Sequence, residues 1–161
     1  MYFFKLLFID MRVVVLENIR SAYNVWNIIR TADALWWKVW ICGYTPDPWD
    51  HKKVTKTSLW AEDGVNLKQF NYTEDAINYA KDNNFKIIAA EIFEWAIDLT
   101  KYSNIIKPDE NLAVIFGNEV DWVLKSTLKI VDDVVYIPMK WIKESLNVGQ
   151  TSAIFMRELN N

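Results

Sequence analysis

Strand-like and helix-like segments alternate along this chain, and their alternation is the feature that most constrains its fold. β-Branched and apolar runs typical of buried strands stand at residues 12–16, 38–42, 86–92, 113–116 and 134–137. Segments with helical spacing of apolar residues stand at 24–35, with Asn24 as the expected N-cap, and at 73–84, 120–130 and 148–159. Strands that alternate with helices pair in parallel and carry helices on both faces of the sheet. We therefore predict an α/β fold with a parallel sheet.

The length of 161 residues predicts a single domain, because no internal repeat or linker divides the chain. We expect the domain to cover residues 1–161, with 1–10 as a possible extraneous leader because Met11 directly precedes the first strand. No apolar run is long enough for a membrane helix, and residues 1–10 lack the features of a signal peptide. These observations favour a cytoplasmic protein without a membrane partner.

Several common site classes have no support in the sequence. There is no GxGxxG, GxxxxGK[ST] or GxSxG motif, which argues against dinucleotide, P-loop and serine hydrolase sites. One cysteine, Cys42, and one histidine, His51, exclude an internal disulfide and disfavour a metal site. We interpret Cys42 as a small core residue and His51 as solvated. The carboxylate pairs Asp132/Asp133 and Glu91/Glu94 fit solvated turns as well as they fit a site.

Three segments at strand-to-helix connections stand out, and open α/β sheets build their sites at such connections. They are NIRSAYNVWNIIRTAD at 18–33, IFGNEVDWV at 115–123 and YIPMKWIKESLNVG at 136–149. In order and in spacing they resemble the three motifs of the SpoU-type (TrmH-type) branch of the SPOUT RNA methyltransferases, which run approximately N-x-G-x-x-x-R-T-A, G-x-E-x-x-G and I-P-M-x-G-x-x-x-S-L-N.

The resemblance implies an α/β-knot fold, in which the C-terminal third forms a trefoil knot that holds S-adenosylmethionine. Such knots are rare exceptions to unknotted chain connectivity. The resemblance also implies a homodimer with an active site completed across the interface. The reaction it implies is methyl transfer to a ribose 2′-hydroxyl of tRNA or rRNA, with no metal.

The motifs assign cofactor-binding roles by resemblance. Gly117 begins the turn that meets the cofactor and has no side chain to block it. Ile137, Met139 and Leu146 match positions around the adenosyl group, and Ser145 supplies a polar anchor in the same loop.

Catalytic roles are carried over in the same way. Arg30 matches the catalytic arginine of the family, and Asn24 lies six residues before it. Glu119 matches the acidic residue of the second motif, an organiser of the site or an RNA contact, while Ser145 and Asn147 are the polar residues of the third. A guanidinium with a pKa above 12 is a poor proton acceptor, so we expect Arg30 to stabilise the developing alkoxide. Without the motif, Arg30 would be interpreted as a surface arginine paired with Asp33.

The chain departs from the family pattern at glycine positions. It contains nine Trp and four Gly, although glycine usually makes up about 7% of a protein. Five tryptophans stand where the family pattern has glycine: Trp26, Trp36, Trp60, Trp122 and Trp141. Glycine would also be reasonable at Trp40, Trp49 and Trp95, and Trp37 is the least certain. One hypothesis is that the gene reads UGA as glycine and was translated as tryptophan; the other is a genuine Trp-rich chain with an impaired cofactor pocket.

Three functions therefore remain open. The first is an S-adenosylmethionine-dependent ribose 2′-O-methyltransferase, the second a catalytically silent RNA-binding or assembly protein on the same fold, and the third a knotted methyltransferase that acts on a base. The net charge of −3 leaves only local basic patches for RNA. The segment HKKVTK at 51–56, together with Lys140 and Lys143, is the candidate for such a patch, or else a solvated loop.

Overall fold

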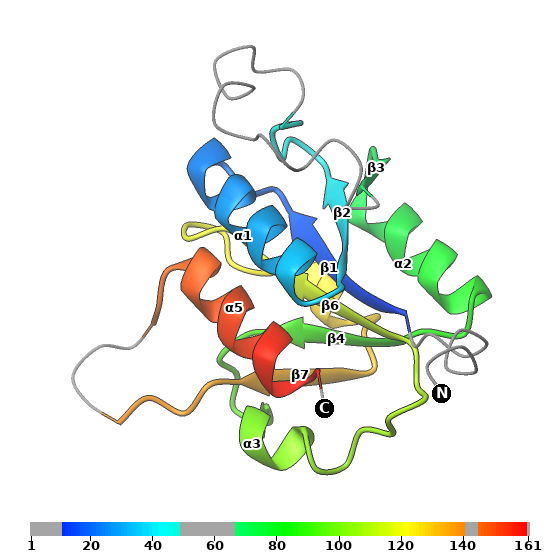
Figure 1. Cartoon of the computed structure of the whole chain (residues 1–161), viewed down its shortest axis with the longest axis vertical. Helices are drawn as coiled ribbons and strands as arrows, with labels where there is room; N and C mark the ends of the chain where they lie inside the picture. The colour runs from blue at the N-terminus through cyan, green and yellow to red at the C-terminus, as the bar shows by residue number, and fades with distance from the viewer. Residues whose placement is uncertain (1–10, 49–66, 141–144, 161) are drawn as a thin grey trace, which may run out of the picture.

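A computed structural model describes residues 11–48, 67–140 and 145–160 of the chain. Its strands form one sheet in the order β3-β2-β1-β6-β4-β7-β5, and every strand pair is parallel (Figure 1). The strands are β1 (Arg12–Glu17), β2 (Lys38–Cys42), β3 (Leu67–Phe70), β4 (Lys86–Ala90), β5 (Ile97–Asp98), β6 (Leu112–Phe116) and β7 (Asp133–Tyr136). The predicted parallel-sheet α/β fold is confirmed.

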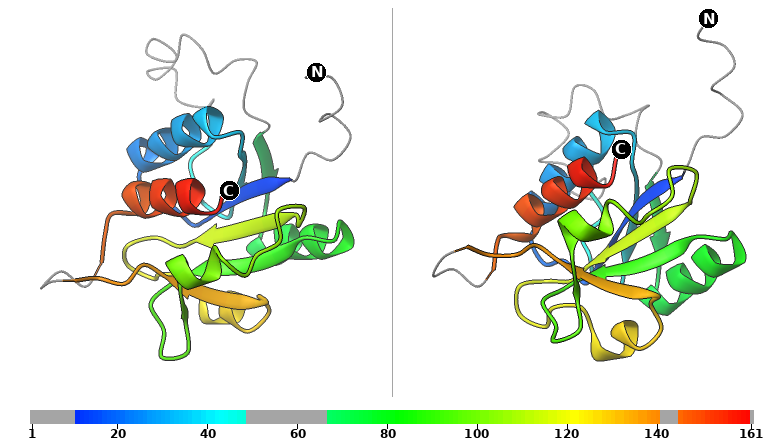
Figure 2. Two further views of the ribbon diagram at one scale, coloured as in Figure 1. Left: turned by 60° about the horizontal axis from the view of Figure 1, so that its bottom comes forward. Right: turned by 90° about the horizontal axis from the view of Figure 1, so that it is seen from below.

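Helices cover both faces of this sheet, as the two views of Figure 2 show. The helices are α1 (Ala22–Ala34), α2 (Thr73–Asp82), α3 (Leu99–Tyr102), α4 (Lys125–Leu128) and α5 (Val148–Glu158). Helices α1 and α5 lie side by side on one face, and α3 packs on the same side of the core. Helices α2 and α4 lie on the other face.

Two apolar layers result, one on each side of the sheet. In β1, Val14 and Leu16 pack with α1 and α5, whereas Val13 and Val15 pack toward α2. Successive side chains of a strand point to opposite faces, so a run of apolar residues is needed when both faces are covered. The central strands β1 and β6 are buried along their whole lengths for this reason.

The N-terminal edge of the sheet is held by polar contacts. Lys86 Nζ lies 2.9 Å from Asp133 Oδ2, and the Tyr102 hydroxyl donates to the same oxygen at 3.2 Å. Asp132 accepts the backbone N–H of Ile87 at 2.7 Å. Asp132 and Asp133 therefore join β4, β7 and α3, and they are not a carboxylate pair of a site.

Helix α1 begins earlier than predicted. Ser21 is its N-cap, and the Ser21 hydroxyl oxygen accepts the backbone N–H of Asn24 at 3.3 Å. The prediction that Asn24 caps the helix is wrong, because its side chain is buried in a different contact, described below.

The helix predicted at 120–130 is shorter than expected. Only Lys125–Leu128 is helical, and Asn118 pairs with Trp122 in an isolated bridge before it. Strands β3 and β5 and helix α3 are present although the sequence pattern did not indicate them.

Two tryptophans occupy backbone conformations that favour glycine. Trp36 has φ = 63° at the end of α1, where Trp37 N–H bonds to the Ala32 carbonyl at 2.8 Å. This bond belongs to the Schellman motif, whose left-handed residue is usually Gly or Asn. At the end of α2 the same motif has Asn84 at that position, with φ = 58°. Trp122 has φ = 61° in the β6–α4 loop.

Other tryptophans are ordinary core residues. Trp37 is 2% exposed and its Nε1–H donates to Asn160 Oδ1 at 3.2 Å. Trp40 is 4% exposed, and its ring lies 5.4–5.6 Å from the rings of Phe70, Tyr79 and Phe85. The backbone thus favours glycine at Trp36 and Trp122, while packing favours tryptophan at Trp37 and Trp40.

Some predictions fall outside the described residues, namely those on residues 1–10, Trp49, the segment 51–56 with His51, Trp60, Trp141 and Lys143. The C-terminal knot stays a prediction. Within the described segments, no helix is long and apolar enough to cross a membrane.

Candidate active site

Loops that follow three strands enclose an open pocket of about 700 Å³ at the C-terminal edge of the sheet. Because the strands are parallel, the loops after β4, β6 and β7 emerge at the same edge. The lining residues are Ala90, Glu91, Ile92, Phe116, Gly117, Asn118, Glu119, Trp122, Val135, Tyr136, Ile137, Met139, Ser145, Leu146, Val148, Thr151 and Phe155. The pocket is mainly apolar with a few polar groups, as expected of a small-molecule site.

The pocket contains every residue predicted to bind the cofactor. Gly117, Ile137, Met139, Ser145 and Leu146 all line it. They come from the second and third sequence motifs, which are separated along the chain but meet at the pocket. The proposed cofactor roles of these five residues stay predictions, because no ligand contact defines them.

Gly117 lies where the chain folds back on itself. A Cβ atom at this position would lie 2.1 Å from the backbone carbon of Trp122 and 2.4 Å from the backbone nitrogen of Val123. No other residue type fits such an approach without moving the backbone. Gly117 therefore allows the β6–α4 loop to double back beside the pocket.

Two carboxylates hold the returning part of this loop. Glu91, after β4, accepts the Val123 backbone N–H through Oε2 at 3.1 Å. Glu17, at the end of β1, accepts the Leu124 backbone N–H through Oε2 at 2.8 Å and also the Thr127 hydroxyl proton. The strands β1 and β4 flank β6, so each side of β6 supplies one acceptor for consecutive backbone amides.

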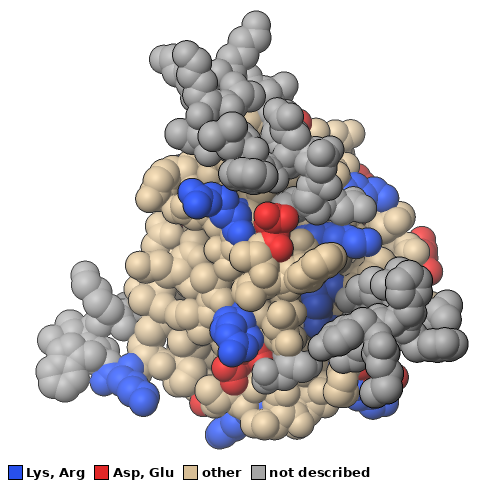
Figure 3. Space-filling model, viewed as in Figure 1, with Lys and Arg blue, Asp and Glu red and all other residues tan. Residues whose placement is uncertain are grey.

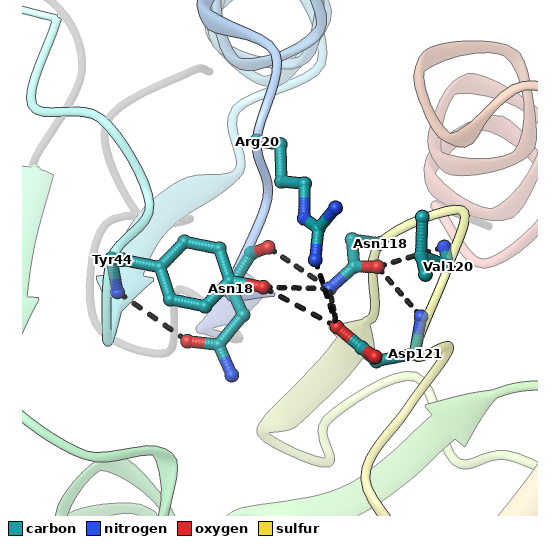
Figure 4. A network of polar contacts seen from close by, with 6 residues as sticks. All are labelled: Asn18, Arg20, Tyr44, Asn118, Val120 and Asp121. Carbon is teal, nitrogen blue, oxygen red and sulfur yellow. Dashed lines mark hydrogen bonds and ion pairs between the residues drawn. The ribbon is translucent and has the colours of Figure 1, made fainter.

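A second polar network joins this loop to the loops after β1 and β2 (Figure 4). Asn118 is 4% exposed, and its Nδ2 donates to the Asn18 carbonyl at 3.1 Å, the Tyr44 hydroxyl at 3.1 Å and Asp121 Oδ2 at 3.3 Å. Its Oδ1 accepts the Val120 and Asp121 N–H groups, each at 2.8 Å. Arg20 reaches Asp121 from the β1–α1 loop at 3.4 Å. Three loops at this edge are thereby tied together.

A further short hydrogen bond joins the first motif to the acidic residue of the second. Asn24 Nδ2 donates to Glu119 Oε1 at 2.7 Å, and Asn24 is 5% exposed. Asn147, from the third motif, lies just outside the pocket, where its side chain caps α5 by accepting the Gly149 N–H at 2.8 Å.

Arg30 does not reach the pocket of its own chain. It lies on the exposed side of α1 and is absent from the pocket lining. Within the described part of the chain it forms no ion pair with Asp33, so the surface-pair interpretation is not supported by a contact. Asn24 and Arg30, six positions apart on a helix with 3.6 residues per turn, point in different directions.

Glu91 lines the pocket, although its sequence context fits a solvated turn as well as it fits a site. Its Oε1 accepts the Ile92 backbone N–H at 2.8 Å in addition to the Val123 bond. Burial raises the pKa of the Glu91 carboxyl, and the two N–H bonds partly oppose this rise. Glu94 is exposed and does not line the pocket, so the two carboxylates do not act as a pair.

Cys42 is a core residue, as predicted. It is 1% exposed at the end of β2, next to Glu17 of β1 in the sheet register. Burial, with a further contribution from the Glu17 charge, raises the pKa of the Cys42 thiol to about 12. Among the described residues, no cluster of three or more histidine, cysteine or acidic side chains has the arrangement of a metal site.

The sequence of this chain is similar to those of known RNA methyltransferases. Residues 11–157 match the model of the SpoU rRNA Methylase family. The tRNA (guanosine(18)-2′-O)-methyltransferase of Thermus thermophilus is 28% identical over 145 residues, which cover 90% of this chain and 72% of that protein.

Solved structures share the fold. A putative RNA methyltransferase of the TrmH family from Porphyromonas gingivalis has a TM-score of 0.80 at 23% identity, over 94% of this chain and 59% of that one. The SpoU methyltransferase AviRb from Streptomyces viridochromogenes, in complex with AdoMet, has a TM-score of 0.78 at 19% identity, over 94% and 57%. This chain thus spans less than two thirds of the length of both solved proteins.

Proposed function

Because this chain belongs to the SpoU rRNA methylase family, we propose that it is an S-adenosylmethionine-dependent RNA methyltransferase that acts on a ribose 2′-hydroxyl. The observation that carries the proposal is the convergence of the second and third motifs on one pocket, to which the first motif is joined through the bond between Asn24 and Glu119. S-Adenosylmethionine supplies a methyl group on a positively charged sulfur.

The lining of the pocket fits this cofactor in its chemistry. It is mainly apolar with a few polar groups, and the apolar wall suits an adenosyl group. Ile137, Met139 and Leu146 would hold that group, with Ser145 as a polar anchor. Glu91 and Glu119 give the pocket negative charge, which suits a cationic ligand.

Arg30 would act on the RNA rather than on the cofactor. We assign it to the 2′-oxygen, where a guanidinium stabilises the alkoxide that develops as the hydroxyl loses its proton. A phosphate or water takes the proton, because the guanidinium already carries its own. Holding the hydroxyl in line with the methyl group at about 3 Å supplies much of the rate.

This role requires a second protomer, because Arg30 lies outside the pocket of its own chain. We propose a homodimer in which α1 and α5 form the interface and Arg30 faces the partner's pocket. Figure 3 shows the side of the molecule that carries these helices as a mainly uncharged surface with separate basic and acidic spots. Tyr23 on α1 is 75% exposed and Ile154 on α5 is 41% exposed. Sedimentation at assay concentration should show a dimer; an active monomer would contradict the assignment.

The substrate is proposed to be tRNA or rRNA. The curated relative from Thermus thermophilus acts on a tRNA guanosine, so tRNA is the first substrate to test.

We also propose that the segment from β7 through α5 forms the trefoil knot of the family. Refolding rates of the full chain and of a variant that lacks α5 would test this proposal: a knotted chain should refold more slowly than the variant, and equal rates would contradict the knot.

A catalytically silent RNA-binding protein is the second candidate, and Trp122 is the observation that favours it. Trp122 is one of the residues that line the pocket, and its backbone holds φ = 61°. An indole fixed there competes with a cofactor for the same space. A base-methylating enzyme remains the third possibility from the sequence.

One experiment separates these functions. The purified chain, and a variant with glycine at Trp122 and Trp141, are incubated with methyl-labelled S-adenosylmethionine and with total tRNA or rRNA, and the digested nucleosides are mapped. The proposal expects label in a 2′-O-methylated nucleoside. Label in a base would indicate a base methyltransferase, and RNA binding without cofactor binding in both proteins would indicate the silent protein.

A further inference from the structure

The charge of the pocket comes from very few side chains. Among the described residues that line it, only Glu91 and Glu119 have acidic side chains, and no lysine, arginine or histidine is among them. The Glu119 carboxylate receives the Asn24 side-chain N–H at 2.7 Å. Within the described segments, the hydrogen bonds of Glu91 come from backbone amides.

The Glu91 carboxylate is held in one orientation. Its two oxygens accept one N–H each, from Ile92 at 2.8 Å and from Val123 at 3.1 Å. Both donors are backbone groups of loops that border the pocket. The negative charge therefore has a fixed position in a partly desolvated site, where an electrostatic interaction is stronger than in water.

Glu17, at the end of β1, can be compared with Glu91 because it binds the same loop. It accepts the next backbone amide, that of Leu124, at 2.8 Å, so it performs the same holding task as Glu91. Glu17 is 0% exposed and does not line the pocket. Of the two carboxylates that hold this loop, only Glu91 has access to a bound ligand.

The proposed reaction changes the charge of the cofactor. Transfer of the methyl group from sulfur to the ribose oxygen breaks the S–C bond, whose electron pair stays on sulfur, and the hydroxyl proton leaves to solvent or phosphate. The sulfonium cation thereby becomes the neutral thioether S-adenosylhomocysteine. The remaining groups of cofactor and product are the same, so charge at the sulfur is the main difference between them.

We propose that Glu91 is a specificity residue that favours the sulfonium form of the cofactor over the neutral product. This inference rests on the proposed function. A fixed carboxylate attracts the cationic cofactor and has no comparable attraction for the thioether, which speeds the exchange of product for new cofactor. Glu91 contacts neither the RNA nor the proton in this scheme.

Calorimetric titration of the full chain with S-adenosylmethionine and with S-adenosylhomocysteine tests the inference. Glu91→Gln should weaken the preference for S-adenosylmethionine by on the order of tenfold, with the product Kd nearly unchanged. Glu17→Gln is the matched control, since it also replaces one amide acceptor with a donor. It should lower Tm but leave the ratio of the two Kd values as in the parent.

The outcomes separate the inference from the proposed function. If Glu91→Gln weakens both ligands equally, or if Glu17→Gln shifts the ratio as much, Glu91 only holds the loop and the inference is wrong. If the parent binds neither ligand, even with glycine at Trp122, the proposed function fails and the inference fails with it.

A measurement on the parent alone covers the case in which Glu91→Gln does not fold. Sinefungin carries a protonated amine in place of the sulfonium, and the parent should bind it more tightly than S-adenosylhomocysteine. Equal affinities for sinefungin and the thioether would overturn the inference.

Discussion

Asn24 of α1 donates its side-chain N–H to Glu119 of the β6–α4 loop at 2.7 Å, and this bond connects two motifs that lie 95 residues apart in the sequence. Its geometry fixes the Glu119 carboxylate next to the pocket that Glu119 lines. The helix that carries Arg30 is thereby tied to the loop that contacts the proposed cofactor.

We expect the two side chains to be energetically coupled. In a double-mutant cycle of Asn24→Ala and Glu119→Ala, urea unfolding should give a coupling free energy of about 1–2 kcal/mol, because each single variant leaves a polar group without its partner. Free energies of unfolding that simply add would show that the bond contributes nothing. Asp132→Ala, which removes the hydrogen bond to the Ile87 N–H at the other edge of the sheet, serves as an uncoupled control paired with Glu119→Ala.

Arg30→Ala should reduce methyl transfer about 10²–10³-fold and leave the Kd for S-adenosylmethionine unchanged, because Arg30 is not part of the pocket lining. Single-turnover methylation and calorimetry on one preparation check both parts. Arg30→Lys should rescue poorly, since an ammonium lacks the planar fork of a guanidinium. Lys81→Ala on α2 is the control on the other face. Loss of cofactor binding by Arg30→Ala would contradict its assignment to the RNA.

Trp36→Gly should raise the free energy of unfolding by about 1 kcal/mol, because glycine adopts the left-handed backbone conformation of this position without strain. Little packing is lost, since the Trp36 side chain is 89% exposed. Trp37→Gly, one position later, should lower it by about 3–5 kcal/mol, because that indole is buried and bonded to Asn160. Chemical denaturation of the two variants checks the pair. A loss of stability in both would argue against glycine as the residue that suits position 36.

Trp122→Gly should raise the affinity for S-adenosylmethionine about tenfold, since it removes a bulky side chain at a residue of the pocket lining and relieves φ = 61°. Calorimetry measures the change. Trp95→Gly is a control, because Trp95 is 58% exposed and does not line the pocket. Intact-mass measurement of protein from its own host shows directly whether position 122 carries tryptophan.

Cys42 should be unreactive toward thiol reagents in the folded protein. A thiol with a pKa of about 12 is about 10⁻⁴ thiolate at pH 8, and the thiolate is the reactive form. The thiolate fraction rises with pH, so alkylation should increase about tenfold for each unit between pH 8 and 11. Mass spectrometry after iodoacetamide treatment checks this, with the urea-unfolded chain as the reactive reference. Rapid alkylation of the native protein at pH 7 would contradict it.

The strands could be predicted closely because they are buried on both faces, so their sequences are continuous apolar runs such as the one in β1. Strand β3 could not, since Leu67–Phe70 is a polar edge strand without such a run. The helix expected at 120–130 failed for a different reason. Its first residues fold back over Gly117 and are held by distant carboxylates, an arrangement that local spacing does not encode.

The pocket residues in the motifs could be identified by resemblance, but Glu91 could not. Its partner Val123 lies 32 residues further along the chain, and a single carboxylate after a strand has no distinctive pattern. Arg30 illustrates the opposite case. Its motif is evident in the sequence. Its position outside the pocket is known only from the structure, in which Arg30 lies on the exposed side of α1.

The two edges of the parallel sheet differ in what they carry. Contacts such as Lys86 with Asp133 lie at the N-terminal edge, while the pocket and its loops lie at the other. Substitutions at the N-terminal edge should therefore change stability with little effect on ligand choice. At the pocket edge the same loops hold the fold and line the pocket, so substitutions there should change both properties together.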